Sequence, residues 1–274
     1  MLRRLILPLL VLLLAPAALL AVDADLIVPV TGTTPGAMQS SWQGELAIHN
    51  SGKQAARIHL TLYGAQGQIE VRNVVVQPGT TMSFDNVVFD LFLLTNATGA
   101  VAINYDDAAN GTIAVTSRIL NHTAGGEFGQ DVPAIAATET LRAGSTGVIV
   151  GPSNAATSRF NFGIFTVDAS KIEWRLLRAD GSLAATVTKE YQAGRHEQYN
   201  GGISTLLGAT PQDDDTLHAR VVSGNAVVYG SIVANSSGDP TFVPGFKVRE
   251  QFAVTLLGVD LDENGSVDIL DADN

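Results

Sequence analysis

The sequence predicts an all-β protein built from two tandem β-sandwich domains. Three observations predict it: segments in which apolar and polar residues alternate, turn signals between those segments, and a long internal repeat. The composition agrees, because the 274 residues are 46% hydrophobic and include 27 Gly and 10 Pro. Such a composition is typical of a folded, turn-rich chain.

The N-terminus predicts a secretory signal peptide over residues 1–24. Two arginines precede an apolar run from Leu5 to about Leu14, and small residues up to Ala24 are suitable for cleavage. An uncleaved membrane anchor is the alternative, but two prolines interrupt a run that is barely long enough to span a bilayer. We therefore expect a secreted or extracytoplasmic protein, in the periplasm or at the cell surface, that is free of the membrane after cleavage.

Charge and cysteine content restrict the function. The net charge of −11 disfavours contact with phosphate backbones, so we expect no nucleic-acid partner. The chain has no Cys, which excludes disulfides, thiol catalysis and thiolate zinc sites. Stability must then come from packing, with metal binding as a further source.

Two segments predict β-hairpins of the same kind. In ARIHLTLYGAQGQIEV, residues 56–71, apolar residues alternate with polar ones up to a Gly-containing turn. SKIEWRLLRADGSLAATV, residues 170–187, repeats the pattern, with Trp174 on the inward register and a turn at Asp180-Gly181. Asp-Gly tolerates the positive φ angles that tight hairpin turns require.

The repeat continues beyond the hairpins at a separation of about 114 residues. It predicts one domain at 25–135 and a second at 136–248, each with about seven short strands. That number favours an immunoglobulin-like sandwich, with a jelly roll as the alternative. The apolar stretch Val87–Leu94 breaks the alternation, and we expect a short helix or crossover there. The matching positions are Gly67 and Gly181, Pro78-Gly79 and Ala193-Gly194, Leu93-Leu94 and Leu207-Gly208, Asn110-Gly111 and Gly224-Asn225, and Asn121 and Asn235.

The tail, residues 249–274, contains a calcium-loop spacing. With Asp260 as position 1, oxygen-bearing side chains fall at positions 1, 3, 5, 9 and 12, and Gly265 at position 6 permits a sharp bend. An acidic tail that binds no metal is the alternative. We predict that Ca²⁺ binds here, through Asp260, Asp262, Asn264, the Ser266 carbonyl, Asp268 and Asp271.

The stretch DLDENGSVDILD resembles an EF-hand loop, and more closely the variant in dockerin repeats and related bacterial extracellular calcium modules, where Asp closes the loop. The resemblance covers about twelve residues and implies calcium binding. Three residues follow Asp271, so we expect neither an exiting helix nor a paired second loop, and cohesin binding is not implied.

The predicted sandwiches resemble repeated β modules of secreted bacterial proteins, which open with a proline-rich strand and a Trp before the first hairpin. Val28-Pro29-Val30 and Trp42 fit that pattern. This resemblance implies a fold and a location, and it implies no ligand.

Catalytic motifs give no support for an enzyme: the sequence contains no HExxH, GxSxG, Walker or Rossmann glycine pattern. We expect a secreted, non-enzymatic structural or adhesion-type protein with an extracellular protein or polysaccharide as partner. The alternative is a carbohydrate-binding accessory module or a hydrolase with a site on a sandwich face, using Asp213–Asp215. The candidate surface aromatics for such a site are Trp42, Tyr63, Tyr191 and Tyr199.

Overall fold

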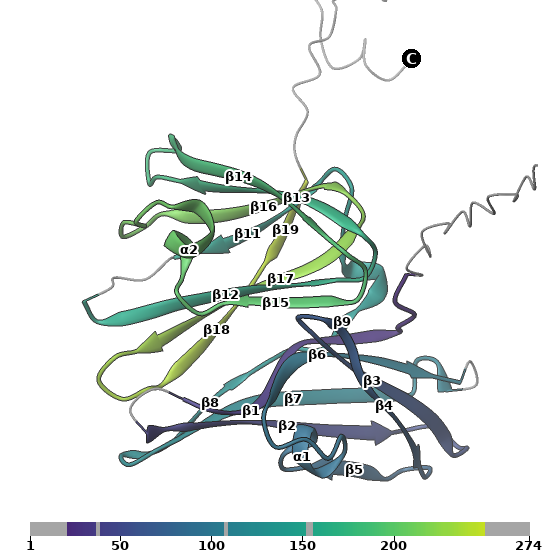
Figure 1. Ribbon diagram of the computed structural model, residues 1–274. Helices are drawn as coiled ribbons and strands as arrows, with labels where there is room; N and C mark the ends of the chain where they lie inside the picture. Colours follow the sequence, from purple (N-terminus) through teal and green to yellow (C-terminus); the bar gives the residue numbers. More distant parts are fainter. Residues whose placement is uncertain (1–20, 37–38, 107–108, 152–155, 250–274) are drawn as a thin grey trace, which may run out of the picture.

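The computed structural model describes residues 21–36, 39–106, 109–151 and 156–249 (Figure 1). The predicted calcium ligands, Asp260 to Asp271, lie outside these residues, as does most of the predicted signal peptide. Within them the protein is all-β, as predicted, with strands β1 to β19 in antiparallel sheets and two short helices. No helix of the described ranges is long and apolar enough to cross a membrane.

The first half of the described chain forms one sheet of nine strands. Its order is β4-β3-β6-β1-β2-β7-β8, with β5 paired to β2 and β9 paired to β1. Strand β1 pairs with β6 over most of its length and with β2 only at its end, so the sheet folds over and encloses a core. The strands are β1 (Leu26–Pro35), β2 (Ser41–Asn50), β3 (Ala56–Gly64), β4 (Gly67–Val76), β5 (Thr81–Phe84), β6 (Ala97–Tyr105), β7 (Ile113–Thr123), β8 (Gly126–Asp131) and β9 (Ile135–Ala136).

The second half forms two sheets of five strands. One has the order β10-β17-β12-β15 with β18 paired to β17, and the other has the order β14-β13-β16-β11-β19. The succession β4-β3-β6-β1 of the first half recurs here as β14-β13-β16-β11. The strands are β10 (Leu141–Arg142), β11 (Ser145–Val150), β12 (Ser158–Thr166), β13 (Ser170–Leu177), β14 (Leu183–Tyr191), β15 (Arg195–Tyr199), β16 (Thr216–Ser223), β17 (Asn225–Ala234), β18 (Pro240–Pro244) and β19 (Phe246–Arg249).

Both predicted hairpins are present. Strands β3 and β4 pair around the first turn, and β13 and β14 pair around the second, where Gly181 has a φ of 82°. A side chain at Gly181 would be strained at that angle, so the Asp-Gly pair suits the turn.

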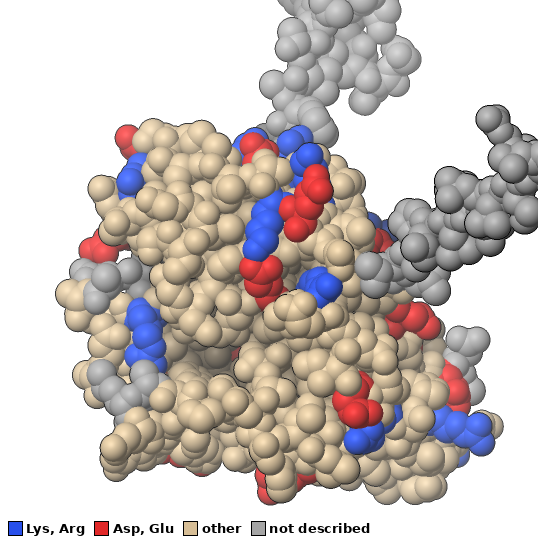
Figure 2. Space-filling view, viewed as in Figure 1, with Lys and Arg blue, Asp and Glu red and all other residues tan. Residues whose placement is uncertain are grey.

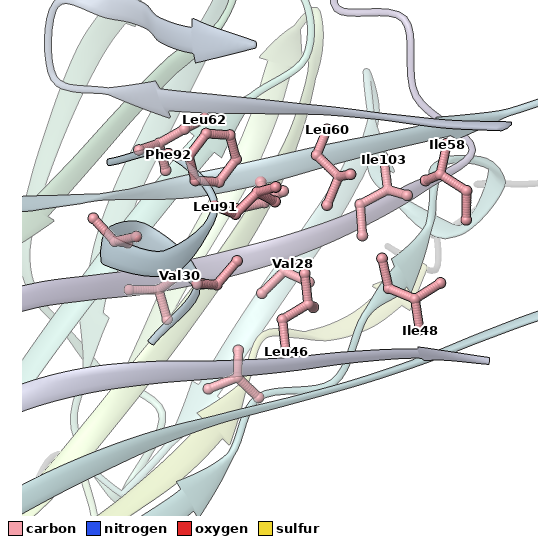
Figure 3. Packing of buried hydrophobic residues seen from close by; sticks show 14 of the residues in the cluster. Val28, Val30, Leu46, Ile48, Ile58, Leu60, Leu62, Leu91, Phe92 and Ile103 are labelled. Carbon is pink, nitrogen blue, oxygen red and sulfur yellow. The ribbon is translucent and has the colours of Figure 1, made fainter. Parts of the chain in front are cut away.

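The helices are α1 (Val87–Asp90) and α2 (Ile203–Leu207), and a 3₁₀ turn η3 (Ala137–Glu139) links the halves. Helix α1 lies in the apolar stretch where the sequence predicts a helix or crossover. The side-chain oxygen of Asn86 caps it by accepting from the Phe89 N–H at 3.1 Å. Figure 3 shows Leu91 and Phe92, just after α1, packed against the buried side chains of β1 and β3.

Each half has its own apolar core. Alternate residues of β1, β2, β3 and β6 fill the first core (Figure 3). The second core surrounds Trp174, which is fully buried, as its register predicts. Phe162 and Tyr199 pack edge-on to its ring, with centroids 5.3 Å and 6.5 Å away.

Candidate functional site

The two halves meet at the outer face of the sheet that contains β12, β15 and β17. Along β12, Phe160, Phe162 and Ile164 point into the second core, so the residues between them point toward the first half. Phe165 is one of these, and its ring lies 5.5 Å from that of Tyr63. We call this contact the joint; its buried members are Val22, Ile27, Ala100, Ala102, Phe165, Val167 and Val227.

Polar contacts also cross between the halves. Arg195 donates from Nη1 to the Ala65 carbonyl at 2.8 Å, and Asn121 donates from Nδ2 to the Gly238 carbonyl at 2.8 Å. Val22 donates its N–H to the Val167 carbonyl at 2.8 Å. The sequence places Val22 inside the predicted signal peptide, so cleavage after residue 24 would remove this contact.

A cleft of about 540 Å³ opens between the halves beside the joint. Its volume is within the range of ligand pockets, about 300–1,000 Å³. Figure 2 shows a hollow between the upper and lower halves, bordered mostly by residues without charge. The first half lines the cleft with Val30, Thr31, Gly32, Thr34, Pro35, Gly36, Trp42, Ala65, Thr98, Ile119 and Gln130, and the second half with Arg159, Asn161, His196, Gln198, Asn200, Tyr229, Ser231 and Val233.

The floor of the cleft depends on a glycine. Gly163 of β12 is paired with Tyr229 on one side and with Gln198 on the other. A Cβ at Gly163 would collide with the ring of Tyr229, so the missing side chain lets this ring lie across β12. The Tyr229 hydroxyl thereby reaches β15, where it lies 2.8 Å from Nε2 of His196 and 3.1 Å from Oε1 of Gln198.

These contacts form a directed chain of hydrogen bonds. Tyr229 donates its one proton to Gln198, so it accepts from the Nε2–H of His196. Gln198 in turn donates from Nε2 to Oδ1 of Asn200 at 2.5 Å. These hydrogen bonds fix the amide of Gln198 and connect it to Asn200.

Burial keeps the titratable members of this chain neutral. It lowers the pKa of His196 to about 4 and raises the pKa of Tyr229 well above its ordinary value. At neutral pH the floor therefore offers fixed hydrogen-bonding groups, and neither side chain is set to exchange protons with a ligand.

The walls contain polar atoms that the described part of the chain leaves without a partner. Oδ1 of Asn161 and Oγ1 of Thr31 are both buried and accept or donate no hydrogen bond there. The guanidinium of Arg159 likewise makes no hydrogen bond or ion pair within the described residues. Ser231 donates to Oε1 of Gln130 at 3.2 Å and so connects the two walls.

The predicted acidic run lies away from the cleft lining. Asp215 is 1% exposed, and its Oδ2 accepts from Nη1 of Arg178 at 2.6 Å and from the Gln212 N–H at 2.7 Å. This carboxylate stabilises the turn that leads into β16. The structure therefore gives Asp215 a structural role, and the use of Asp213–Asp215 in a catalytic groove is not supported.

The four candidate surface aromatics occupy different environments in the structure. Trp42 is half-buried and lines the cleft, and Tyr63 packs in the joint. The prediction is wrong for Tyr191 and Tyr199, which are 6% and 9% exposed. Their hydroxyls bond each other at 2.9 Å, and Nε1 of Trp174 donates to Tyr191 at 3.0 Å, so these polar tips are satisfied inside the second core.

Sequence reasoning did not find the polar residues of the cleft, such as Asn161, His196 and Gln198. In β12 their signal is the alternation of polar with apolar residues, which also fits a solvent-facing side, and β15 is polar at every position before Tyr199. Across the described ranges, no three His, Asp or Glu side chains come together in a way that could hold a metal ion. No protein-family model matches the chain, and no curated protein sequence is significantly similar to it.

Proposed function

We propose that the chain is a secreted, non-enzymatic adhesion-type protein that binds an extracellular polysaccharide in the cleft between two tandem immunoglobulin-like sandwiches. The recurrence of one strand order in both halves supports the two sandwiches. The C-terminal loop, Asp260 to Asp271, would bind Ca²⁺ as its spacing predicts.

The observation that carries this proposal is the lining of the cleft, to which both halves contribute. It combines amides, hydroxyls and a half-buried Trp42 in a concave site. Amides and hydroxyls match the alternating donors and acceptors of sugar hydroxyls, and an indole covers the apolar face of a sugar ring. A neutral floor of fixed hydrogen bonds fits recognition better than hydrolysis, which requires a proton donor and a carboxylate across the bond.

Retention on immobilised polysaccharides tests this function. We expect the secreted chain to be retained by at least one member of a panel of neutral and acidic polysaccharides and to release no reducing ends from it. Asn161→Trp, which fills the cleft, should abolish retention. Thr188→Trp, at an exposed position of β14, should leave retention unchanged. Equal retention of both variants would place the binding surface elsewhere, and release of reducing ends would show that the protein is an enzyme.

Calcium binding is tested separately, by calorimetry on the secreted chain. We expect one saturable site of roughly millimolar affinity, the weak class of extracellular calcium loops. Asp260→Ala should abolish the heat of binding because it removes the first carboxylate of the loop. Asp239→Ala, outside the loop, should leave it unchanged. A titration that is the same in both variants would contradict the assigned ligands.

A further inference from the structure

We propose that the cleft is specific for an acidic saccharide, with the carboxylate of a uronic acid paired to Arg159 and a neighbouring hydroxyl bonded to Asn161. This inference rests on the proposed function, because it names the class of sugar that the cleft would bind. Three features of the cleft lead to it: its charge, its unsatisfied polar atoms and their spacing.

The charge of the cleft comes from Arg159. His196 is neutral at pH 7 because burial lowers its pKa to about 4, and no carboxylate occurs among the described lining residues. The guanidinium of Arg159 is half-buried and makes no ion pair within the described ranges. In a chain of net charge −11, the cleft is therefore a locally positive place. A guanidinium binds a carboxylate through two parallel charge-assisted hydrogen bonds, and its positive charge repels an ammonium ligand.

The unpaired acceptor in the cleft wall favours a ligand that donates hydrogen bonds. Oδ1 of Asn161 is a buried acceptor without a donor in the described structure. Unpaired buried polar atoms are unfavourable and are normally satisfied by a partner. A ligand hydroxyl could pair with this acceptor, because a hydroxyl donates one hydrogen bond and accepts others.

The spacing of Arg159 and Asn161 allows one ligand to contact both side chains. Arg159 and Asn161 are two positions apart on β12 and on the same face, about 7 Å along the strand. Ser231 lies beside Asn161 on β17, and its hydroxyl is held by Gln130. A carboxylate at Arg159 and ring hydroxyls at Asn161 and Ser231 therefore fit one or two adjacent sugar rings. The Trp42 indole, which also lines the cleft, supplies apolar contact area for a ring.

Calorimetry on the secreted chain tests the inference with matched ligands. The probes are short oligomers of galacturonate, glucuronate and mannuronate, together with the methyl esters of the same oligomers. Esterification removes the charge and keeps the sugar rings. We expect at least one acid to bind and its ester to bind about tenfold to hundredfold more weakly, the difference of a charge-assisted pair.

Variants assign the effect to Arg159. Arg159→Gln should reduce the affinity for the acid to that of the ester and leave the ester unaffected. Arg57→Gln, which changes an exposed arginine outside the cleft, should change neither affinity. Asn161→Leu should weaken the binding of the acid and of the ester alike, because it removes the amide that pairs with a hydroxyl of the sugar. Thermal melts of all three variants should match the unmodified protein, since none of these side chains packs in a core.

The outcomes separate this inference from the proposed function. If acid and ester bind equally, or if Arg159→Gln has no effect on the acid, the inference is wrong and the polysaccharide function stands. If only neutral or sulfated polysaccharides are retained in the adhesion assay, the inference is also wrong while the function stands. If no polysaccharide of any kind binds, both are wrong.

Discussion

Trp174→Ala is expected to lower the free energy of unfolding by about 3–5 kcal/mol, the range for truncating a large buried aromatic residue. Trp174 is fully buried, and Phe162 and Tyr199 pack against its ring. Truncation leaves a cavity and removes the donor to the Tyr191 hydroxyl. Chemical denaturation followed by circular dichroism measures the loss, because the substitution also removes a fluorescent probe.

Trp42→Ala is the matched control for this prediction. Trp42 is half-buried at the cleft, so its truncation creates less cavity and leaves no donor–acceptor pair broken in a core. We expect a clearly smaller loss of stability there. A loss at Trp174 of less than about 1 kcal/mol, or one equal to that at Trp42, would contradict the placement of Trp174 at the centre of the second core.

The sequence was sufficient to predict the features that depend on local patterns. Alternation with period two placed Trp174 inward and identified both hairpins, because a strand sends successive side chains to opposite faces. The Asp180-Gly181 turn followed from the chemistry of hairpin turns, and the break in alternation at Val87–Leu94 predicted a helix or crossover where α1 lies. Each of these features is determined by residues that are close together in the sequence.

The cleft could not be predicted in this way, because it depends on which two faces meet. Arg159 and Asn161 alternate with buried phenylalanines, a pattern that fits solvent exposure as well as it fits a wall of a cleft. In the sequence, Gly163 is a glycine in a strand, which weakens that strand. Its role is visible only in the structure, where the ring of Tyr229 occupies the space of the missing side chain. The burial of Tyr191 and Tyr199 was missed for a related reason, since their hydroxyls find partners across the second core.

Phe165→Ala is expected to have the second large effect, a loss of about 3–5 kcal/mol together with uncoupling of the two halves. Phe165 is fully buried although it faces away from the second core, because the first half covers it. Its truncation removes the ring that Tyr63 packs against in the joint. Since the joint holds the walls of the cleft together, calorimetric unfolding should separate into two transitions, and polysaccharide binding should weaken.

Phe162→Ala controls for the size of the substitution. Like Phe165→Ala, it replaces a buried phenylalanine of β12 by alanine, but Phe162 faces the second core. We expect a comparable loss of stability that is confined to the second half, with the cleft still formed and binding retained below the unfolding temperature. If Phe165→Ala instead unfolds in one transition and binds polysaccharide as before, the walls are held by contacts other than the joint. The Arg195–Ala65 and Asn121–Gly238 hydrogen bonds would then be the next to remove, because they are among the polar links between the two halves.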